Sequence, residues 1–132
     1  MNTKDAGDRS EACILAAFVK AGYKVLIPFG DNQRYDMVID RGKGFERVQC
    51  KTGRLRSGTV RFNAYSSYAH RGRPRRTYGG QIELFAVYCP DNDAVYILPI
   101  EEATVSSEVS LRITAPKNGQ NQRVRWAKDY LL

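Results

Sequence analysis

The sequence predicts a single domain of the α/β or α+β class, and three observations lead to this prediction. The chain has 132 residues, which is close to the most common size of one domain. A segment near its start carries apolar residues at helical spacing. Most later segments are short apolar or alternating runs, as in strands. One helix followed by several strands and then by mixed elements is typical of these two classes.

The helix is expected over residues 8–21. Gly22 is placed to end it, and its apolar residues recur at helical spacing: Ile14, Leu15, Phe18 and Val19. Glu11 precedes this stripe by three residues, so it extends the apolar face rather than the polar one. A carboxylate at that place either interacts with the positive end of the helix dipole or points at a functional group.

Strands are expected in the runs YKVLIPF, YDMVID, FERVQCK, VRFNAYS, IELFAVYC, AVYILPI and SLRITAP. The second and third of these runs form a hairpin over residues 35–51, with its turn at residues 41–44. IELFAVYC and AVYILPI are apolar enough to be buried on both faces, which predicts the middle of a sheet. A short helical turn is expected in EEATVSSE, and NQRVRWAKDYLL is a basic, aromatic C-terminal segment.

Charge and cysteine content narrow the class of function. The chain has 21 Lys and Arg against 14 Asp and Glu, a net charge of +7, which suggests nucleic acid as partner; a merely basic surface is the alternative. Three cysteines without a CxxC pattern and a single histidine, His70, speak against zinc and disulfides. The polar N-terminus and the lack of a long apolar run predict no membrane segment and a soluble, cytoplasmic protein.

The positive charge is concentrated between Thr52 and Ile82, where no acidic residue occurs. This segment holds the candidate DNA-binding arginines: Arg54, Arg56, Arg61, Arg71, Arg73, Arg75 and Arg76. On the alternating run, Arg61, Asn63 and Tyr65 would face outward, as on a β-ribbon that reads bases in the major groove. HRGRPRR is expected to contact the phosphate backbone, with a solvated basic loop as the alternative.

The predicted hairpin brings polar side chains together. Gln49 and Lys51 share one face of their strand, and Val48 and Cys50 share the other. A hairpin symmetric about its turn places Asp36 opposite Gln49, with Cβ atoms about 4.5–5.5 Å apart. An acid, an amide and an amine would therefore meet on one small patch.

This patch suits a hard divalent cation. Mg²⁺ prefers oxygen ligands, which Asp36, the Gln49 side chain and the Cys50 carbonyl could supply, with Glu11 as a further ligand. Lys51 could orient or deprotonate the attacking water. Each residue also has an ordinary explanation, as a turn aspartate, an exposed strand lysine or a solvent-facing glutamine.

These segments resemble the PD-(D/E)XK nuclease superfamily and, within it, the group I intron-encoded homing endonucleases of cyanobacterial type. GDRSEA, LIPFGDNQRYDMVID, RVQCKTGR, LFAVYCPDNDAVYILPIEE and RVRWAKDYLL carry the resemblance, and PFGDN, YD and VQCKTGR in this order are its most specific part. The resemblance implies a restriction-endonuclease-like mixed β-sheet flanked by helices. It also implies Mg²⁺ or Mn²⁺ as cofactor and the catalytic set Glu11, Asp36, Gln49 and Lys51.

Two positions depart from the superfamily pattern. Tyr35 stands in place of the proline of the motif, with little chemical consequence. Gln49 stands in place of the usual Glu or Asp, so the metal would be held by one negative charge fewer, and Glu11 would matter more. Glutamine also occurs here in the homing group that the sequence resembles.

The expected function is therefore site-specific cleavage of both strands of duplex DNA, as in intron homing, by one nuclease domain over residues 1–132 with a basic DNA-contacting insertion at 54–80. One active site cuts one strand, so at least a dimer is expected; the resemblance points to a homotetramer. Two alternatives remain open, a Holliday junction resolvase or other structure-selective nuclease, and a non-catalytic DNA-binding module.

Overall fold

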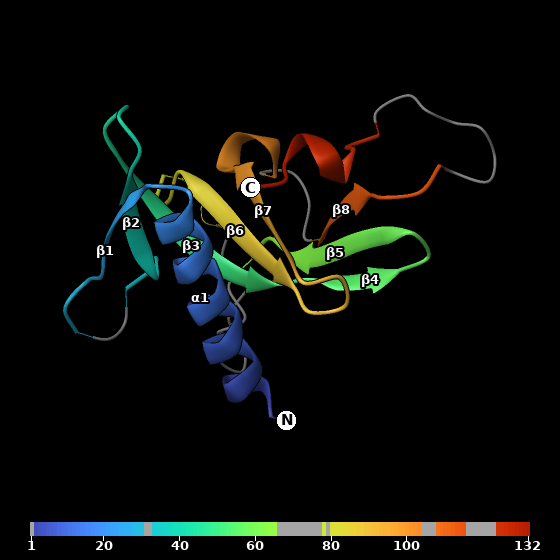
Figure 1. The fold of residues 1–132 in the computed structure, drawn as a ribbon, viewed down its shortest axis with the longest axis horizontal. Helices are drawn as coiled ribbons and strands as arrows, with labels where there is room; N and C mark the ends of the chain where they lie inside the picture. Colours follow the sequence, from blue (N-terminus) through green and yellow to red (C-terminus); the bar gives the residue numbers. More distant parts are fainter. Residues whose placement is uncertain (1, 31–32, 66–77, 79, 104–107, 116–123) are drawn as a thin grey trace.

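The fold is built around a five-stranded mixed sheet, with strand order β1-β2-β3-β6-β7 (Figure 1). The computed structural model describes residues 2–30, 33–65, 78, 80–103, 108–115 and 124–132. The strands of this sheet are β1 (Lys24–Leu26), β2 (Met37–Asp40), β3 (Phe45–Thr52), β6 (Leu84–Cys89) and β7 (Ala94–Pro99). Only the central pair, β3 and β6, is parallel, and the other neighbours are antiparallel.

Helix α1 (Thr3–Lys20) crosses one face of this sheet (Figure 1). It begins five residues before the predicted start at residue 8. The prediction was wrong there because it followed apolar spacing, whereas the start is set by a polar cap: the Asn2 side chain accepts a hydrogen bond from the Asp5 backbone nitrogen at 2.8 Å. The helix ends at Lys20, before Gly22 with its positive φ of 86°.

The hairpin of β2 and β3 has the predicted register. Met37 pairs with Val48 and Asp40 with Phe45, and Gly42 and Gly44 in the turn both have positive φ. β6 is buried along its whole length, as predicted.

β7 lies at the edge of the sheet, so the prediction that it is a middle strand was wrong. Its open edge is partly covered by the C-terminal residues, since the Ile97 and Leu132 backbone nitrogens donate to the Tyr130 and Val95 carbonyls at 2.8 and 3.0 Å. The C-terminal residues that cover this edge explain why β7 is apolar although no further strand pairs with it.

A second, three-stranded sheet packs on the opposite face, with order β4-β5-β8. Its strands are β4 (Arg54–Arg56), β5 (Thr59–Asn63) and β8 (Glu108–Arg112). Two short 3₁₀ turns complete the described elements: η1 (Ile100–Glu102) follows β7, and η2 (Ala127–Asp129) lies just before the C-terminal residues. η1 overlaps the start of the region, residues 101–108, where a helical turn was predicted.

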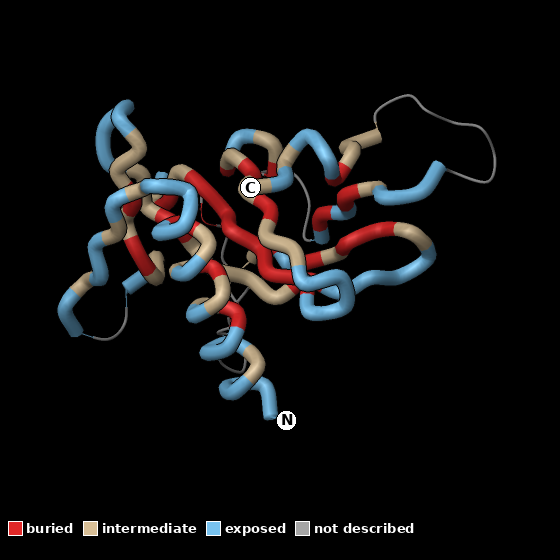
Figure 2. The backbone as a smooth tube through the Cα atoms, viewed as in Figure 1, coloured by how far each residue is buried: buried red, intermediate tan, exposed pale blue. Residues whose placement is uncertain are grey.

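The central sheet thus has a hydrophobic core on each face, and β6 contributes to both, so the buried trace runs through the middle of the molecule (Figure 2). Phe18, Val48 and Ala86 belong to the core under α1, and Phe62, Phe85 and Val87 to the core under the second sheet. The predicted mixed sheet in one small domain is confirmed, with one α-helix among the described residues. No helix in these residues is long and apolar enough to cross a membrane.

Gly53, between β3 and β4, packs closely against side chains of both sheets. A Cβ atom at this position would lie 2.9 Å from the Val60 Cγ1 and 2.9 Å from the Val87 Cγ1, both buried in the core. Gly53→Ala is therefore expected to destabilise the protein by about 1–3 kcal/mol, as overpacking of a core does. Denaturant unfolding measures this change.

Gly7→Ala is the matched control, because a Cβ at exposed Gly7 on α1 meets no atom within 4 Å. It should stabilise the helix by up to about 1 kcal/mol. Equal stability of the two variants would contradict the close approach at Gly53.

Candidate active site

Asp36 lies directly before β2, where the hairpin fixes both its backbone and its carboxylate. Its backbone nitrogen donates to the Val48 carbonyl at 2.8 Å, and its Oδ2 accepts from the Cys50 backbone nitrogen at 2.8 Å. Burial raises the pKa of Asp36, and the hydrogen bond from Cys50 and the charge of Lys51 offset part of this rise. The Asp36 carboxylate is thus held in a fixed position in a partly desolvated environment.

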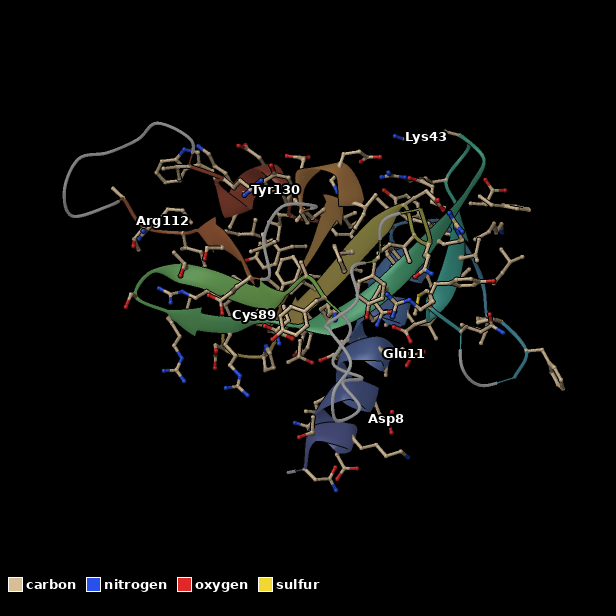
Figure 3. All side chains as sticks on the ribbon, turned by 180° about the vertical axis from the view of Figure 1, so that it is seen from behind. Asp8, Glu11, Lys43, Cys89, Arg112 and Tyr130 are labelled. Carbon is tan, nitrogen blue, oxygen red and sulfur yellow. The ribbon has the colours of Figure 1, made fainter. Side chains whose placement is uncertain are left out.

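Glu11 faces this carboxylate from helix α1. Both residues line a hollow of about 300 Å³ that is completed by residues of the loop after β1: Ile27, Pro28, Gly30, Gln33 and Tyr35. Figure 3 shows Glu11 on the helix beside the sheet, with Asp8 one turn nearer the N-terminus. Burial, then the charges of Asp36 and Asp8, raise the pKa of Glu11. Glu11 therefore lies in a concentrated negative field.

Gln49 and Cys50 follow from the register of β3. Cys50 packs against the core under α1, and burial, followed by the charges of Asp36 and Glu11, raises the pKa of its thiol well above its usual range. The Gln49 Nε2 donates a long hydrogen bond of 3.4 Å to the Cys50 carbonyl. Neither residue lines the hollow shared by Glu11 and Asp36.

Lys51 lies on the face of β3 opposite to Cys50, half-buried beneath an aromatic side chain. Its Nζ donates to the Tyr65 carbonyl at 2.8 Å and to the Tyr78 hydroxyl at 3.4 Å. Burial lowers its pKa to about 8; Asp36 acts against this shift, and Arg34 adds to it. At pH 7 about one tenth of the molecules would then carry a neutral amine, a far larger fraction than for an ordinary lysine.

Arg34 and Tyr78 were not predicted as neighbours of Lys51. Spacing gave no signal for Arg34, because residues 33–36 lie outside the strands and the alternation of a strand does not apply to them. Tyr78 lies at the end of the basic segment, and its place beside Lys51 depends on tertiary packing that the spacing of residues does not encode.

The described residues contain no group of three or more His, Cys, Asp or Glu side chains that could hold a metal ion. A divalent cation would therefore need oxygen ligands beyond Glu11 and Asp36. The Gln49 amide oxygen and the Cys50 carbonyl are of the kind that Mg²⁺ accepts. Glu11 and Asp36 share one hollow, and the amide and the carbonyl lie outside it on strand β3, so the four groups are donors of a suitable chemical kind.

Of the candidate base-reading residues, Arg61 and Asn63 lie on β5, which pairs with β4 in a two-stranded ribbon of the second sheet, whereas Tyr65 lies beyond the end of β5. Arg54 pairs with Arg61 across the ribbon, so these two side chains share a face, and Arg56 lies on the same face by alternation. Asn63 is exposed there, whereas Val60 and Phe62 on the other face are buried. The arginines Arg71, Arg73, Arg75 and Arg76 lie outside the described residues.

Comparison with known proteins decides the family. The model of the PD-(D/E)XK endonuclease family matches residues 1–132. The chain belongs to this family. None of the curated proteins matches it in sequence.

One solved structure is similar to this PD-(D/E)XK protein over almost its whole length. The bacterial homing endonuclease I-Ssp6803I has 25% sequence identity and a TM-score of 0.69, with 98% of this chain and 86% of that chain covered. Archaeoglobus fulgidus Hjc, a Holliday junction resolvase from an archaeal hyperthermophile, has 17% identity and a TM-score of 0.47, with 80% and 83% covered. The predicted superfamily and fold are confirmed by the family match and by I-Ssp6803I.

Proposed function

We propose that this PD-(D/E)XK endonuclease is a Mg²⁺-dependent, site-specific DNA endonuclease that makes double-strand breaks, of the intron-homing type. The observation that carries the proposal is the hairpin, which holds the Asp36 carboxylate on the Cys50 backbone, opposite Glu11 and close to the charge of Lys51. The similarity to a homing endonuclease supports duplex DNA as the substrate.

Each residue has a distinct role in the proposed reaction. Asp36, Gln49 and the Cys50 carbonyl hold the cation, and Glu11 contributes a second carboxylate from the helix. A bound Mg²⁺ supplies charge for the phosphoryl oxygens and lowers the pKa of its water. Lys51, with its lowered pKa, orients the attacking water or takes its proton.

Two strands must be cut, and each chain carries one such site. We infer that the enzyme acts as a homo-oligomer, at least a dimer, whose two sites face opposite strands of a roughly symmetric target. The net charge of +7 favours association of the protein with the phosphate backbone of DNA.

The direct test is incubation with plasmid and four-way junction DNA, with and without Mg²⁺. We expect linear product from the plasmid pool at a defined sequence, only in the presence of Mg²⁺ or Mn²⁺. Cleavage of the junction alone would assign the protein to the structure-selective nucleases instead. DNA binding without any cleavage would assign it to the non-catalytic DNA-binding modules.

Arg61→Ala and Asn63→Ala are expected to relax sequence preference. Each should cost about 1–3 kcal/mol of binding to the cognate site, as loss of a base-edge contact does. Competition between cognate and scrambled duplexes measures the effect. Asn92→Ala, on the turn between β6 and β7, is the control. Equal loss of affinity for both duplexes would show that Arg61 and Asn63 contact only the backbone.

A further inference from the structure

The ring of Tyr78 is fixed in place by the core under the second sheet. Tyr78 is 4% exposed, and its ring meets that of Phe85 edge to face, with centroids 5.5 Å apart and an interplanar angle of 89°. Phe85 in turn packs on Phe62 with a centroid distance of 5.6 Å. Such a ring cannot move without disturbing the packing beneath it.

Lys51 lies against this fixed ring. Its Nζ is 5.0 Å from the ring centroid and 3.4 Å from the Tyr78 hydroxyl oxygen, and the Tyr65 carbonyl accepts its shortest hydrogen bond at 2.8 Å. A lysine side chain has four rotatable carbon–carbon bonds, so contacts at its tip are needed to hold the ammonium group in one place.

The guanidinium group of Arg34 stacks on the face of the Tyr78 ring. The guanidinium carbon is 4.1 Å from the Tyr78 centroid, which is cation–π stacking distance. The Arg34 Nε also donates to the Gln81 Oε1, and the Gln81 backbone nitrogen donates to the Tyr78 carbonyl at 3.0 Å. Arg34, which lies only two residues before Asp36, therefore contacts both Tyr78 and Gln81, and these two are joined by a backbone hydrogen bond.

We propose that Arg34 and Tyr78 are positioning residues, which together hold the Lys51 ammonium beside Asp36 by joining the segment before β2 to the ring on which the lysine lies. The inference rests on the proposed nuclease function for its effect on catalysis. Its physical basis is that displacement of a catalytic group by about 1 Å can slow a reaction by about 100-fold. Neither residue needs to touch the substrate.

The first experiment separates stacking from charge. Arg34→Lys keeps the positive charge for DNA but lacks the planar guanidinium that stacks on Tyr78 and bonds Gln81. We expect its single-turnover cleavage rate to fall by about 10-fold or more, with DNA affinity in Ca²⁺ within about 3-fold of wild type. Arg41→Lys, at an ion pair with Glu46 in the hairpin turn, is the control and should cleave normally. Wild-type cleavage by Arg34→Lys would overturn the proposal.

A pair of Tyr78 variants tests the ring. Tyr78→Phe keeps the ring and the Phe85 contact and should lose no more than about 3-fold in cleavage rate, whereas Tyr78→Leu should lose at least about 10-fold. Thermal unfolding checks that Tyr78→Leu is folded; if it is not, the Arg34→Lys and Tyr78→Phe rates decide. A larger loss in Tyr78→Phe than in Arg34→Lys would mean that the hydroxyl, not the braced ring, matters, and would overturn the proposal.

A further experiment does not depend on cleavage activity, so it separates this inference from the proposed function. In DNA-free protein with ¹³C-labelled lysine, the ε-methylene signal of Lys51, assigned by its loss in Lys51→Met, should be displaced by the Tyr78 ring current. In Arg34→Lys it should move toward the signals of the exposed lysines, while Arg41→Lys leaves it in place. An unmoved Lys51 signal in Arg34→Lys overturns the proposal even if the wild-type enzyme cleaves DNA. Absence of cleavage by the wild type would contradict only the proposed function.

Discussion

Asp36→Asn is expected to lower the rate of DNA cleavage by at least about 10³-fold, a loss of about 4 kcal/mol of transition-state stabilisation. The change removes one negative charge from the proposed donor set, in which Gln49 contributes an amide and no charge. Asparagine can still accept the hydrogen bond from the Cys50 nitrogen, so the hairpin should keep its shape. DNA affinity in Ca²⁺ should therefore stay within a few-fold of wild type.

The same variant should be at least as stable as the wild type at pH 7 without metal. The pKa of Asp36 is raised on folding, so the folded state binds the proton more tightly than the unfolded chain. The ionised carboxylate then costs stability above the folded pKa, and this cost disappears below the ordinary value of 3.8. Thermal unfolding in EDTA at pH 7 and pH 3.5 measures the difference, which should vanish at the lower pH.

Asp40→Asn is the matched control, because Asp40 lies at the other end of β2 from Asp36 and outside the site. The Asp40 Oδ1 accepts from the Gly42 nitrogen in the turn, a bond that asparagine can also make. This variant should cleave at the wild-type rate. Cleavage by Asp36→Asn close to that rate would remove Asp36 from the mechanism, and a marked loss of stability would show that its carboxylate has a structural role.

The part of the site that could be predicted is the part set by local periodicity. Alternation on β3 and a glycine-rich turn determine which residue faces which, and so the observed pairing of Met37 with Val48 follows from the sequence. Glu11 could be placed on the buried side of α1 for the same reason, since the 3.6-residue period puts it next to Ser10 and Ile14, which are buried.

Long-range packing set the features that could not be predicted. The parallel pairing of β3 with β6 joins residues 36 positions apart, and the sequence of neither strand indicates which strand it pairs with. The edge place of β7 was missed because residues 130–132 cover it, so an edge strand could carry an apolar composition. Long-range packing also brings Tyr65 and Tyr78, which lie outside the hairpin, next to Lys51. Their contact with Lys51 therefore could not be predicted from the hairpin.

Local hydrogen bonding explains the remaining error. The first turn of α1 has no large apolar residue to reveal it, and Asn2 stabilises it by capping the Asp5 nitrogen. A search for capping residues ahead of the apolar stripe would have included this start among several candidates: Asn2, Thr3, Asp5, Asp8 and Ser10. Such a search would not have altered the expected place of Glu11, which lies well inside the helix by either boundary.

Lys51→Met is expected to slow cleavage by about 10²–10³-fold while leaving binding within a few-fold. Methionine keeps an unbranched apolar stem against Tyr78 but has no amine to take a proton from water or to face the developing charge. Lys51→Ala should lose as much activity and in addition some packing. Single-turnover rates on one duplex, with affinity measured in Ca²⁺, separate the two effects.

Lys43→Met is the control for general loss of charge, because Lys43 is exposed in the hairpin turn at the far end of β2 and β3. It should leave the cleavage rate unchanged. In folded Lys51→Met, the amine that is desolvated at a pKa of about 8 is replaced by an apolar group, so unfolding at pH 7 should occur at an equal or higher temperature. Loss of activity together with a gain in stability is expected only of a charge retained for function, since a structural lysine would give the opposite stability change.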